Sequence, residues 1–171
     1  MGELAKRNTT QGAIEKVILR GDLSGLTEVE RLQYNFALCE SLGLNPITRP
    51  IDYIAEQGKI SPYINAIGVA QLREIHGIST KIIRVNKDDE FVYTTAAAVN
   101  RNGRSEEATA IVPLCDRYGK PLTGQHKANA IMKCETKAKR RATLALCGFG
   151  DGNGRILKEN TPADLLPEEE F

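Results

Sequence analysis

The cations between Lys127 and Arg141 are the residues whose type and spacing point most directly to a chemistry. This stretch holds six cations and a single acid, Glu135, so the ion pairs that usually stabilise a solvent-exposed helix face are nearly absent. Like charges crowded together are unfavourable unless a partner neutralises them. The six cations are Lys127, Lys133, Lys137, Lys139, Arg140 and Arg141. A long anionic partner, such as a nucleic acid, is therefore the first candidate.

A long helix is expected to carry these cations. The stretch from Gln125 to Cys147 contains no glycine or proline and is long enough for about six helical turns. At about 100° per residue, Lys133, Lys137 and Arg140 line up on one face, with Arg141 at its edge. A stripe of mostly small apolar residues lies opposite and consists of Ile131, Cys134, Ala138, Ala142 and Ala145. We expect this stripe to pack on a sheet and the cationic face to point outwards.

Composition and charge divide the chain into a body and a tail. The 171 residues are 41% hydrophobic and 26% charged, which is typical of a soluble globular protein. The formal net charge is only +1, but residues 151–171 contain six acids and two cations, a net of −4, which leaves +5 for residues 1–150. We expect one core domain over residues 1–150, with nucleic acid as its candidate partner, and an acidic, flexible tail over residues 151–171.

No pattern in the sequence indicates an enzyme. His76 and His126 stand apart from each other, and the only glycine-rich run, residues 148–154, follows a helix and lacks the lysine of a P-loop. Asp88 and Asp89 fall in a turn between two expected strands, which favours solvated loop charge over a metal site. We therefore expect no catalytic residues, no cofactor and no bound metal.

The cysteines and the apolar runs indicate a cytoplasmic protein. Four cysteines show no pairing or zinc-binding spacing and are expected to be buried free thiols, namely Cys39, Cys115, Cys134 and Cys147. No apolar run approaches the roughly 18 residues of a membrane span, so we expect no membrane association.

Hydrophobic periodicity and turn signals predict an α+β fold, with an antiparallel β-sheet that supports the helices on one face. Strands are expected over residues 51–56, 60–64, 80–85, 90–99 and 105–114, as a hairpin followed by a three-stranded meander. A short amphipathic segment is expected at residues 9–19. Three helices are expected after it, from the capping box at Thr27 to Gly43, from Asn65 to His76, and over the basic stretch from Gln125 to Cys147. In the first helix, Leu32, Phe36 and Cys39 recur at the spacing of a core-facing stripe.

The aromatic content bears on how a nucleic acid would be held. The chain has no tryptophan, and Tyr53, Tyr63 and Tyr118 are scattered, so no platform for stacking bases is evident. The phosphates should therefore be gripped instead. Such binding would be largely independent of base sequence and strongly dependent on salt.

Two regions resemble a known family. Residues 42–51 read LGLNPITRPI and are followed by ISPY at residues 60–63 and by Gly68. Downstream, residues 119–123 lead into the basic helix, which ends in LALCGF at residues 144–149. Together these regions resemble the Gly-Leu-Asn-Pro motif and the basic helix of the RecT/Redβ family of phage single-strand annealing proteins. The resemblance covers most of residues 18–150, and this chain would be a short member of the family.

The resemblance implies a function and a set of partners. Proteins of this family coat single-stranded DNA as rings or helical filaments, without ATP, and anneal it to a complementary strand during phage recombination and DNA repair. This chain would act as such a recombinase in the cytoplasm of a bacterial host, on single-stranded DNA and the annealed duplex intermediate. A phage exonuclease or a host single-strand-binding protein is a further implied partner, engaged through a C-terminal region that this chain mostly lacks.

The resemblance also assigns DNA-binding residues. Lys137, Arg49 and Arg20 match cationic positions of the family, and Lys59 lies near another. A further family arginine aligns with Leu144, so its role passes to Arg140 and Arg141 by helical proximity. The helix pattern alone adds three more cations, Lys127, Lys133 and Lys139.

Assembly is required if one protomer holds too few nucleotides to recognise a complement. Residues 9–19 and the first helix are candidate contacts between protomers, although core packing also explains their apolar residues. Two other functions stay open. The first is a protein that coats single-stranded DNA without annealing it, and the second is a protein-interaction module whose basic helix binds an acidic partner.

Overall fold

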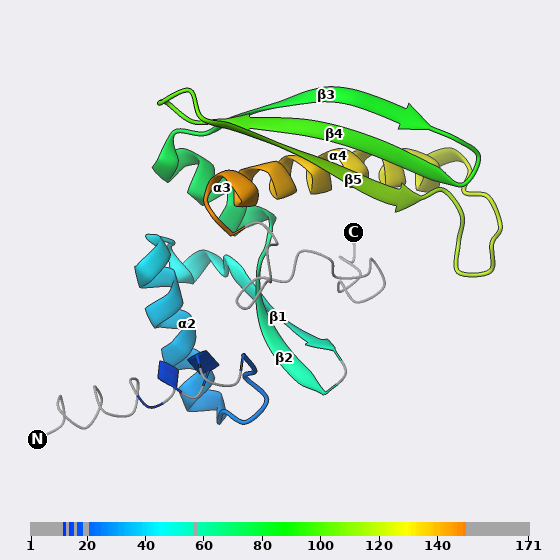
Figure 1. Ribbon diagram of the computed structural model, residues 1–171. Coiled ribbons are helices and arrows are strands. Elements are labelled where there is room, and N and C mark those ends of the chain that lie inside the picture. The colour runs from blue at the N-terminus through cyan, green and yellow to red at the C-terminus, as the bar shows by residue number, and fades with distance from the viewer. Residues whose placement is uncertain (1–11, 13, 16, 19–20, 57, 150–171) are drawn as a thin grey trace, which may run out of the picture. The chain divides into compact units, whose positions relative to one another are not determined.

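The chain adopts an α+β fold, as the sequence predicted (Figure 1). A computed structural model describes residues 12, 14, 15, 17, 18, 21–56 and 58–149, and the expected acidic tail lies outside these residues. The fold consists of a two-stranded hairpin, a three-stranded antiparallel meander and helices that include the long basic one. The chain forms two compact units, with the division between Gln71 and Leu72. Each unit is described below by itself.

The first unit contains the hairpin and the first helices. Residues 12, 14, 15, 17 and 18 are helical, within the segment expected to be amphipathic. The elements that follow are α2 (Glu28–Leu42), the short 3-10 helix η1 (Pro46–Thr48), β1 (Ile51–Glu56), β2 (Lys59–Ile64) and the first part of α3 (Ala66–His76). The two strands pair in antiparallel register from Ile51 with Ile64 to Glu56 with Lys59. These bounds agree with the predicted hairpin and helices.

The predicted capping box at the start of α2 is confirmed. The Thr27 hydroxyl oxygen accepts a hydrogen bond from the Glu30 amide at 3.2 Å, and the Thr27 amide donates to the Glu30 carboxylate at 2.9 Å. Two of the amides that a helix start leaves without helical partners are satisfied in this way. Gly43 ends the helix in the left-handed conformation, with φ of 68°, as its position predicted.

The predicted core face of α2 is largely wrong. Leu32 and Phe36 are 57% and 52% exposed, and only Cys39 of the expected stripe is buried. Tyr34 is buried instead, in a cluster with Val17, Leu23 and Leu26. Helical spacing shows which side chains share a face, but it does not show whether another element covers that face. Exposed Val29, Leu32 and Phe36 follow one another at helical spacing, and we call them the α2 apolar stripe.

The second unit is the meander with α4 packed on one face (Figure 1). Its elements, after the end of α3, are β3 (Ser79–Lys87), β4 (Phe91–Val99), β5 (Ser105–Pro113) and α4 (Gly124–Leu146). The strands lie in the order β3-β4-β5, and each neighbouring pair is antiparallel. The prediction of a three-stranded meander leading into the long basic helix is therefore confirmed.

Small residues form much of the interface between α4 and the sheet. Cys134, Ala138 and Ala142 have no exposed surface, as the predicted stripe requires, and they face small residues of the sheet such as Ala96 and Ala98. Two members of the predicted stripe differ, because Ile131 and Ala145 are only partly buried. Ala130 and Leu146 complete the buried stripe instead. The Cys134 thiol lies 3.3 Å from the Val92 carbonyl oxygen, because the small side chains on this side of the helix let it lie close to the sheet.

The expectation of four buried cysteines is only half right. Cys39 and Cys134 are buried, whereas Cys115 and Cys147 are partly exposed, and all four are free thiols. Burial raises the pKa of the Cys39 and Cys147 thiols above their usual value. Among the helices that the structure describes, none combines the length and the hydropathy of a membrane-spanning segment.

Gly68 provides a test of packing in the first unit. A Cβ atom at this position of α3 would lie 2.5 Å from the Pro50 carbonyl oxygen and 2.6 Å from Ile64 Cγ2. We predict that Gly68→Ala lowers the free energy of unfolding by about 1 to 3 kcal/mol, because backbone atoms must move to admit the methyl group. Urea denaturation measures this change. Glu74→Ala, at an exposed position of the same helix, is the control, and equal stabilities for the two variants would contradict the packing described here.

Candidate nucleic-acid interface

All six cations expected on the basic helix lie on α4, but they differ in exposure. Lys133 is exposed, and Lys127, Lys137, Lys139, Arg140 and Arg141 are partly buried. In the part of the chain that the structure describes, no ion pair joins Lys127, Lys133 or Lys139 to an acid. The cationic set is therefore positioned by the buried apolar stripe on the other side of the same helix.

The exposed part of the cationic face is shorter along the helix than the sequence suggested. Leu144 continues the line of Lys137 and Arg140 along the helix, yet it is only 3% exposed. Thr143 is fully buried too, so the last turns of α4 are covered on more than one side. The Nε atoms of Arg140 and Arg141 are also buried. The expectation of a cationic face that points outwards along the whole helix is therefore wrong towards its C-terminal end, and Lys133 is its most accessible member.

The Gly-Leu-Asn-Pro segment forms the turn that presents Arg49. The Asn45 side chain accepts a hydrogen bond from the Ile47 amide at 3.1 Å, which caps η1, and the buried Leu44 anchors the turn. Gln71 secures it from α3, because its side chain accepts from the Asn45 amide at 2.8 Å and donates to the Thr48 hydroxyl at 2.7 Å. The sequence reasoning missed Gln71, since no local pattern marks a contact 26 residues away.

Arg49 itself has an unusual backbone. Its φ is 52°, the only positive value for a residue other than glycine in the described part of the chain, and its side chain is exposed. The left-handed conformation costs a residue with a Cβ atom roughly 1 to 2 kcal/mol. The Asn65 side chain helps to hold it by donating to the Arg49 carbonyl oxygen at 2.7 Å. A strained backbone at an exposed arginine motivates a test of whether the side chain has a function.

Asp22 ties the segment before α2 to the hairpin. Asp22 accepts hydrogen bonds from the Ser24 hydroxyl and amide and from the Ile60 amide of β2, the last at 2.8 Å. These bonds, led by those from Ser24 and helped by the charge of nearby Lys59, lower the pKa of Asp22 to about 2. Asp22 therefore has a structural role. Arg20, the preceding expected DNA contact, lies outside the described residues.

The expected site residues fall into two sets. Arg49 and Lys59 belong to the first unit, and the six cations of α4 belong to the second. Within the first unit the two are not brought together, because Arg49 precedes the open end of the hairpin and Lys59 pairs with Glu56 next to its turn. Roughly 17 Å of strand separates these two ends, at about 3.3 Å per residue. Among the expected site residues that the structure describes, the six cations of α4 are the ones that share a single element.

The sequence reasoning missed an aromatic pair on the sheet. The even-numbered residues Val92 and Ala96 of β4 lie in the core between the sheet and α4. The odd-numbered residues of this strand therefore point away from α4. Phe91 and Tyr93 therefore share the open face, with ring centroids 6.3 Å apart. The alternation of Phe91, Tyr93 and Thr95 is the signal that would have found them. The open face has a shallow depression of about 420 Å³, lined by Arg84, Asn86, Lys87, Asp88, Tyr93, Thr95 and Thr109.

The acidic side chains of the loops have structural roles in the described part of the chain. No group of three or more His, Cys, Asp or Glu side chains there could hold a metal ion. Asp88 illustrates the role of the loop acids, since it accepts hydrogen bonds from the Glu90 and Phe91 amides that lower its pKa. It is a turn-forming residue, in line with the expectation of solvated loop charge.

Asp22 should make stability depend on pH in the acid range. Because folding lowers its pKa from 3.8 to about 2, its ionised form stabilises the fold above about pH 4, and this contribution is lost as the pH falls towards 2. We predict that Asp22→Asn is less stable than the wild type at pH 7 and that the difference shrinks between pH 4 and pH 2. Urea denaturation across this range measures it. Asp89→Asn, in an exposed turn, is the control, and a difference that does not change with pH would refute the assignment.

Arg49 permits a test that separates backbone from side chain. Arg49→Gly removes the strain of the left-handed conformation but makes the unfolded chain more flexible, so we predict a net gain of about 0.5 kcal/mol in stability. Arg49→Ala keeps the strain and should leave stability nearly unchanged. Both variants should bind single-stranded DNA more weakly than the wild type if the guanidinium contacts phosphate. Thermal unfolding and fluorescence titration measure the two effects, and unchanged DNA affinity in both variants would remove Arg49 from the interface.

Comparison with known proteins adds no support to the resemblance. No protein-family model matches this chain, and no curated protein matches it significantly. The relationship to the RecT/Redβ family therefore stays a prediction. It depends on the Gly-Leu-Asn-Pro segment and the basic helix, and α4 and the turn before Arg49 are the parts of the structure that bear on it.

Proposed function

We propose that this protein binds single-stranded DNA through its phosphates and anneals complementary strands, without ATP, as an oligomer. The observation that carries the proposal is the cationic set on α4. Six cations share this helix with a single acid, and Lys133 is exposed and forms no ion pair within the described residues. An isolated protein gains nothing from crowding like charges on one helix. A polyanion along the helix would neutralise them and release counterions.

Annealing follows from a grip on phosphates. If the protein holds the backbone and leaves the bases unread, a strand is displayed with its pairing edges free. A second strand can then test those edges, and base pairing supplies the specificity. Cations along one helix reach only a few nucleotides, so several protomers must act side by side to display a stretch long enough to select its complement. Such an activity belongs to phage recombination and repair in the cytoplasm of a bacterial host.

A protein-interaction module is the alternative that a specific observation favours. The α2 apolar stripe of Val29, Leu32 and Phe36 is exposed, and exposed apolar patches often mark protein contacts. A fluorescence titration with a labelled oligonucleotide at low salt separates the two functions. Absence of DNA binding under these conditions would favour the interaction module and reject the main proposal.

Substitutions on α4 test the phosphate grip. We predict that Lys133→Ala and Lys137→Ala each weaken single-stranded DNA binding to a similar degree for every base sequence and lower the slope of log affinity against log salt by about one. Lys120→Ala, an exposed loop cation in the same unit, is the matched control and should change neither quantity. Wild-type affinity and slope in both α4 variants would show that the DNA is held elsewhere.

Annealing is separable from coating. Two complementary strands that carry a fluorophore and a quencher report pairing directly when they are mixed with and without the protein. We expect the wild type to accelerate pairing and the two α4 variants to lose this acceleration in parallel with their affinity. A protein that binds each strand but leaves the pairing rate unchanged would be a coating protein without annealing activity.

A further inference from the structure

The meander has two exposed edges. Its strand order is β3-β4-β5, and within the described residues no strand pairs with the outer edge of either β3 or β5. The free N–H and C=O groups of an edge strand can pair with another chain. Proteins that stay monomeric usually protect such edges with charge, and here the charges on the two edges are opposite in sign.

The two edge strands are complementary in charge. β3 carries the cations Lys81, Arg84 and Lys87 and no acid, whereas β5 carries Glu106 and Glu107 and no cation. The registers align two of these charges, because Lys81 pairs with Ala97 on β4 and Ala97 pairs with Glu107 on β5. Lys81 and Glu107 therefore lie at the two ends of one row, on the face of the sheet opposite α4.

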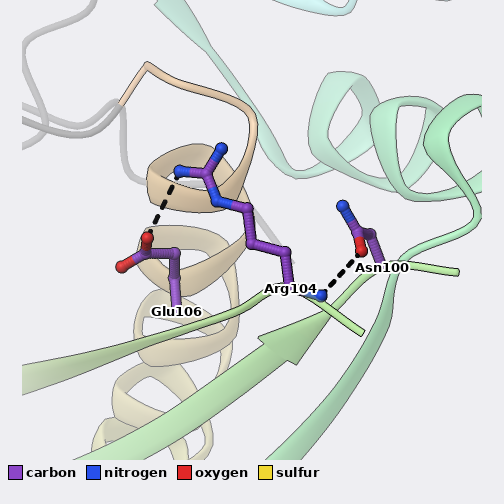
Figure 2. Close-up of polar contacts among 3 residues, drawn as sticks. All are labelled: Asn100, Arg104 and Glu106. Atoms are coloured by element: carbon purple, nitrogen blue, oxygen red, sulfur yellow. Dashed lines mark hydrogen bonds and ion pairs between the residues drawn. The ribbon is translucent and has the colours of Figure 1, made fainter. Parts of the chain in front are cut away.

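Lys81 and Glu107 are available for a contact, whereas Glu106 is already engaged. Figure 2 shows the Arg104 side chain reaching Glu106, with Nη2 of Arg104 at 3.3 Å from Oε1. The Arg104 amide also donates to the Asn100 side chain at 3.1 Å, which fixes the turn between β4 and β5. Lys81 and Glu107 are both exposed, and neither forms an ion pair within the part of the chain that the structure describes.

We propose that β5 of one copy pairs with β3 of the next copy, with Glu107 beside Lys81 of the neighbour. β3 and β5 both run antiparallel to β4, so they run in the same direction, and a continued sheet joins them as a parallel pair. This arrangement keeps both charges on the same face. Pairing of β3 with β3, or of β5 with β5, would bring like charges together. The contact is therefore head-to-tail, which generates rings or helical filaments and not closed dimers.

The structure limits the length of this pairing. A register shift between Ile82 and Arg84 interrupts β3, and Pro113 at the end of β5 has no N–H to donate. The regular part of the contact is thus residues 79–82 of one copy with residues 105–108 of the other. The proposed contact is therefore short and contains one charge pair on the open face.

The position of α4 supports the same pairing of β5 with β3 of the next copy. α4 packs mainly against β4 and β5 and contacts β3 little. Val85 of β3 pairs with the fully buried Thr94 and so points to the helix side, yet it is 44% exposed. In a continued sheet, the helix beneath β5 of the adjoining copy is the nearest element that could cover Val85.

The contact would bring copies of α4 into a repeating row. That consequence rests on the proposed function, since a row of cationic helices is useful only if they hold one DNA strand. The contact itself does not depend on DNA binding, and oligomeric state is its readout. Loss of assembly with retained binding to a short oligonucleotide would concern the edge alone, whereas loss of DNA binding by an assembled protein would concern α4 alone.

Charge reversal tests the pairing. Sedimentation velocity of the full chain, with and without a poly-dT oligonucleotide, should show assemblies for the wild type in at least one of the two conditions. Lys81→Glu and Glu107→Lys should each weaken association by roughly tenfold, because a repulsion replaces the attraction at every contact. The double variant Lys81→Glu/Glu107→Lys should assemble again, since each contact again joins a cation to an anion.

Mixing the two single variants gives the sharpest result. Each is defective alone, but in a mixture every β5–β3 contact between unlike copies joins opposite charges, so the two should assemble in alternation. Lys87→Glu, on the same strand beyond the register shift, is the matched control and should assemble like the wild type. The proposal is overturned if the wild type is monomeric in both conditions, if the single reversals assemble normally, or if neither the double variant nor the mixture recovers.

Discussion

Close packing between α4 and the meander is the constraint on which the rest of the second unit depends. Cys134, Ala138 and Ala142 leave no exposed surface, and Ala96 and Ala98 of β4 meet them with equally small side chains. Small residues on both surfaces let the helix lie close to the sheet and fix its rotation about its own axis. Since that rotation is fixed, Lys133 must point away from the sheet. The position of Lys133 therefore follows from apolar packing.

A polar network has the corresponding role in the first unit. Asn45, Gln71 and Thr48 hold the turn between α2 and β1, and Asn65 holds the next residue, Arg49, from its carbonyl oxygen. Each bond of this kind contributes only about 1 kcal/mol. Together they maintain a backbone conformation at Arg49 that an isolated peptide would avoid. Packing thus positions the cations of α4, and hydrogen bonds position Arg49.

Local patterns in the sequence predicted the elements well, because they depend on neighbours along the chain. The capping box at Thr27 and the periodicity of α4 are of this kind. Burial depends on what lies across space, and there the prediction failed. Leu32 and Phe36 have the spacing of a core face but remain exposed, and Leu144 lies in line with cations but is buried. Gln71 was missed for the same reason, since its partners Asn45 and Thr48 are far away in the sequence. The pair of Phe91 and Tyr93 differs, because the alternation along β4 already indicated their shared face.

The two proposed tasks, DNA binding and association of copies, would fall on different surfaces of the second unit. A surface that binds DNA and also joins copies would lose one activity whenever it performed the other. Here α4 covers one face of the sheet, while Lys81 and Glu107 lie at its edges and on the opposite face. Contacts between copies along the edges would therefore leave Lys133 on the outer side of α4 accessible. In the proposed assembly the cations on α4 would repel one another across neighbouring copies, so a phosphate backbone bound along them would also favour assembly. Binding and association would then reinforce each other without sharing a single residue.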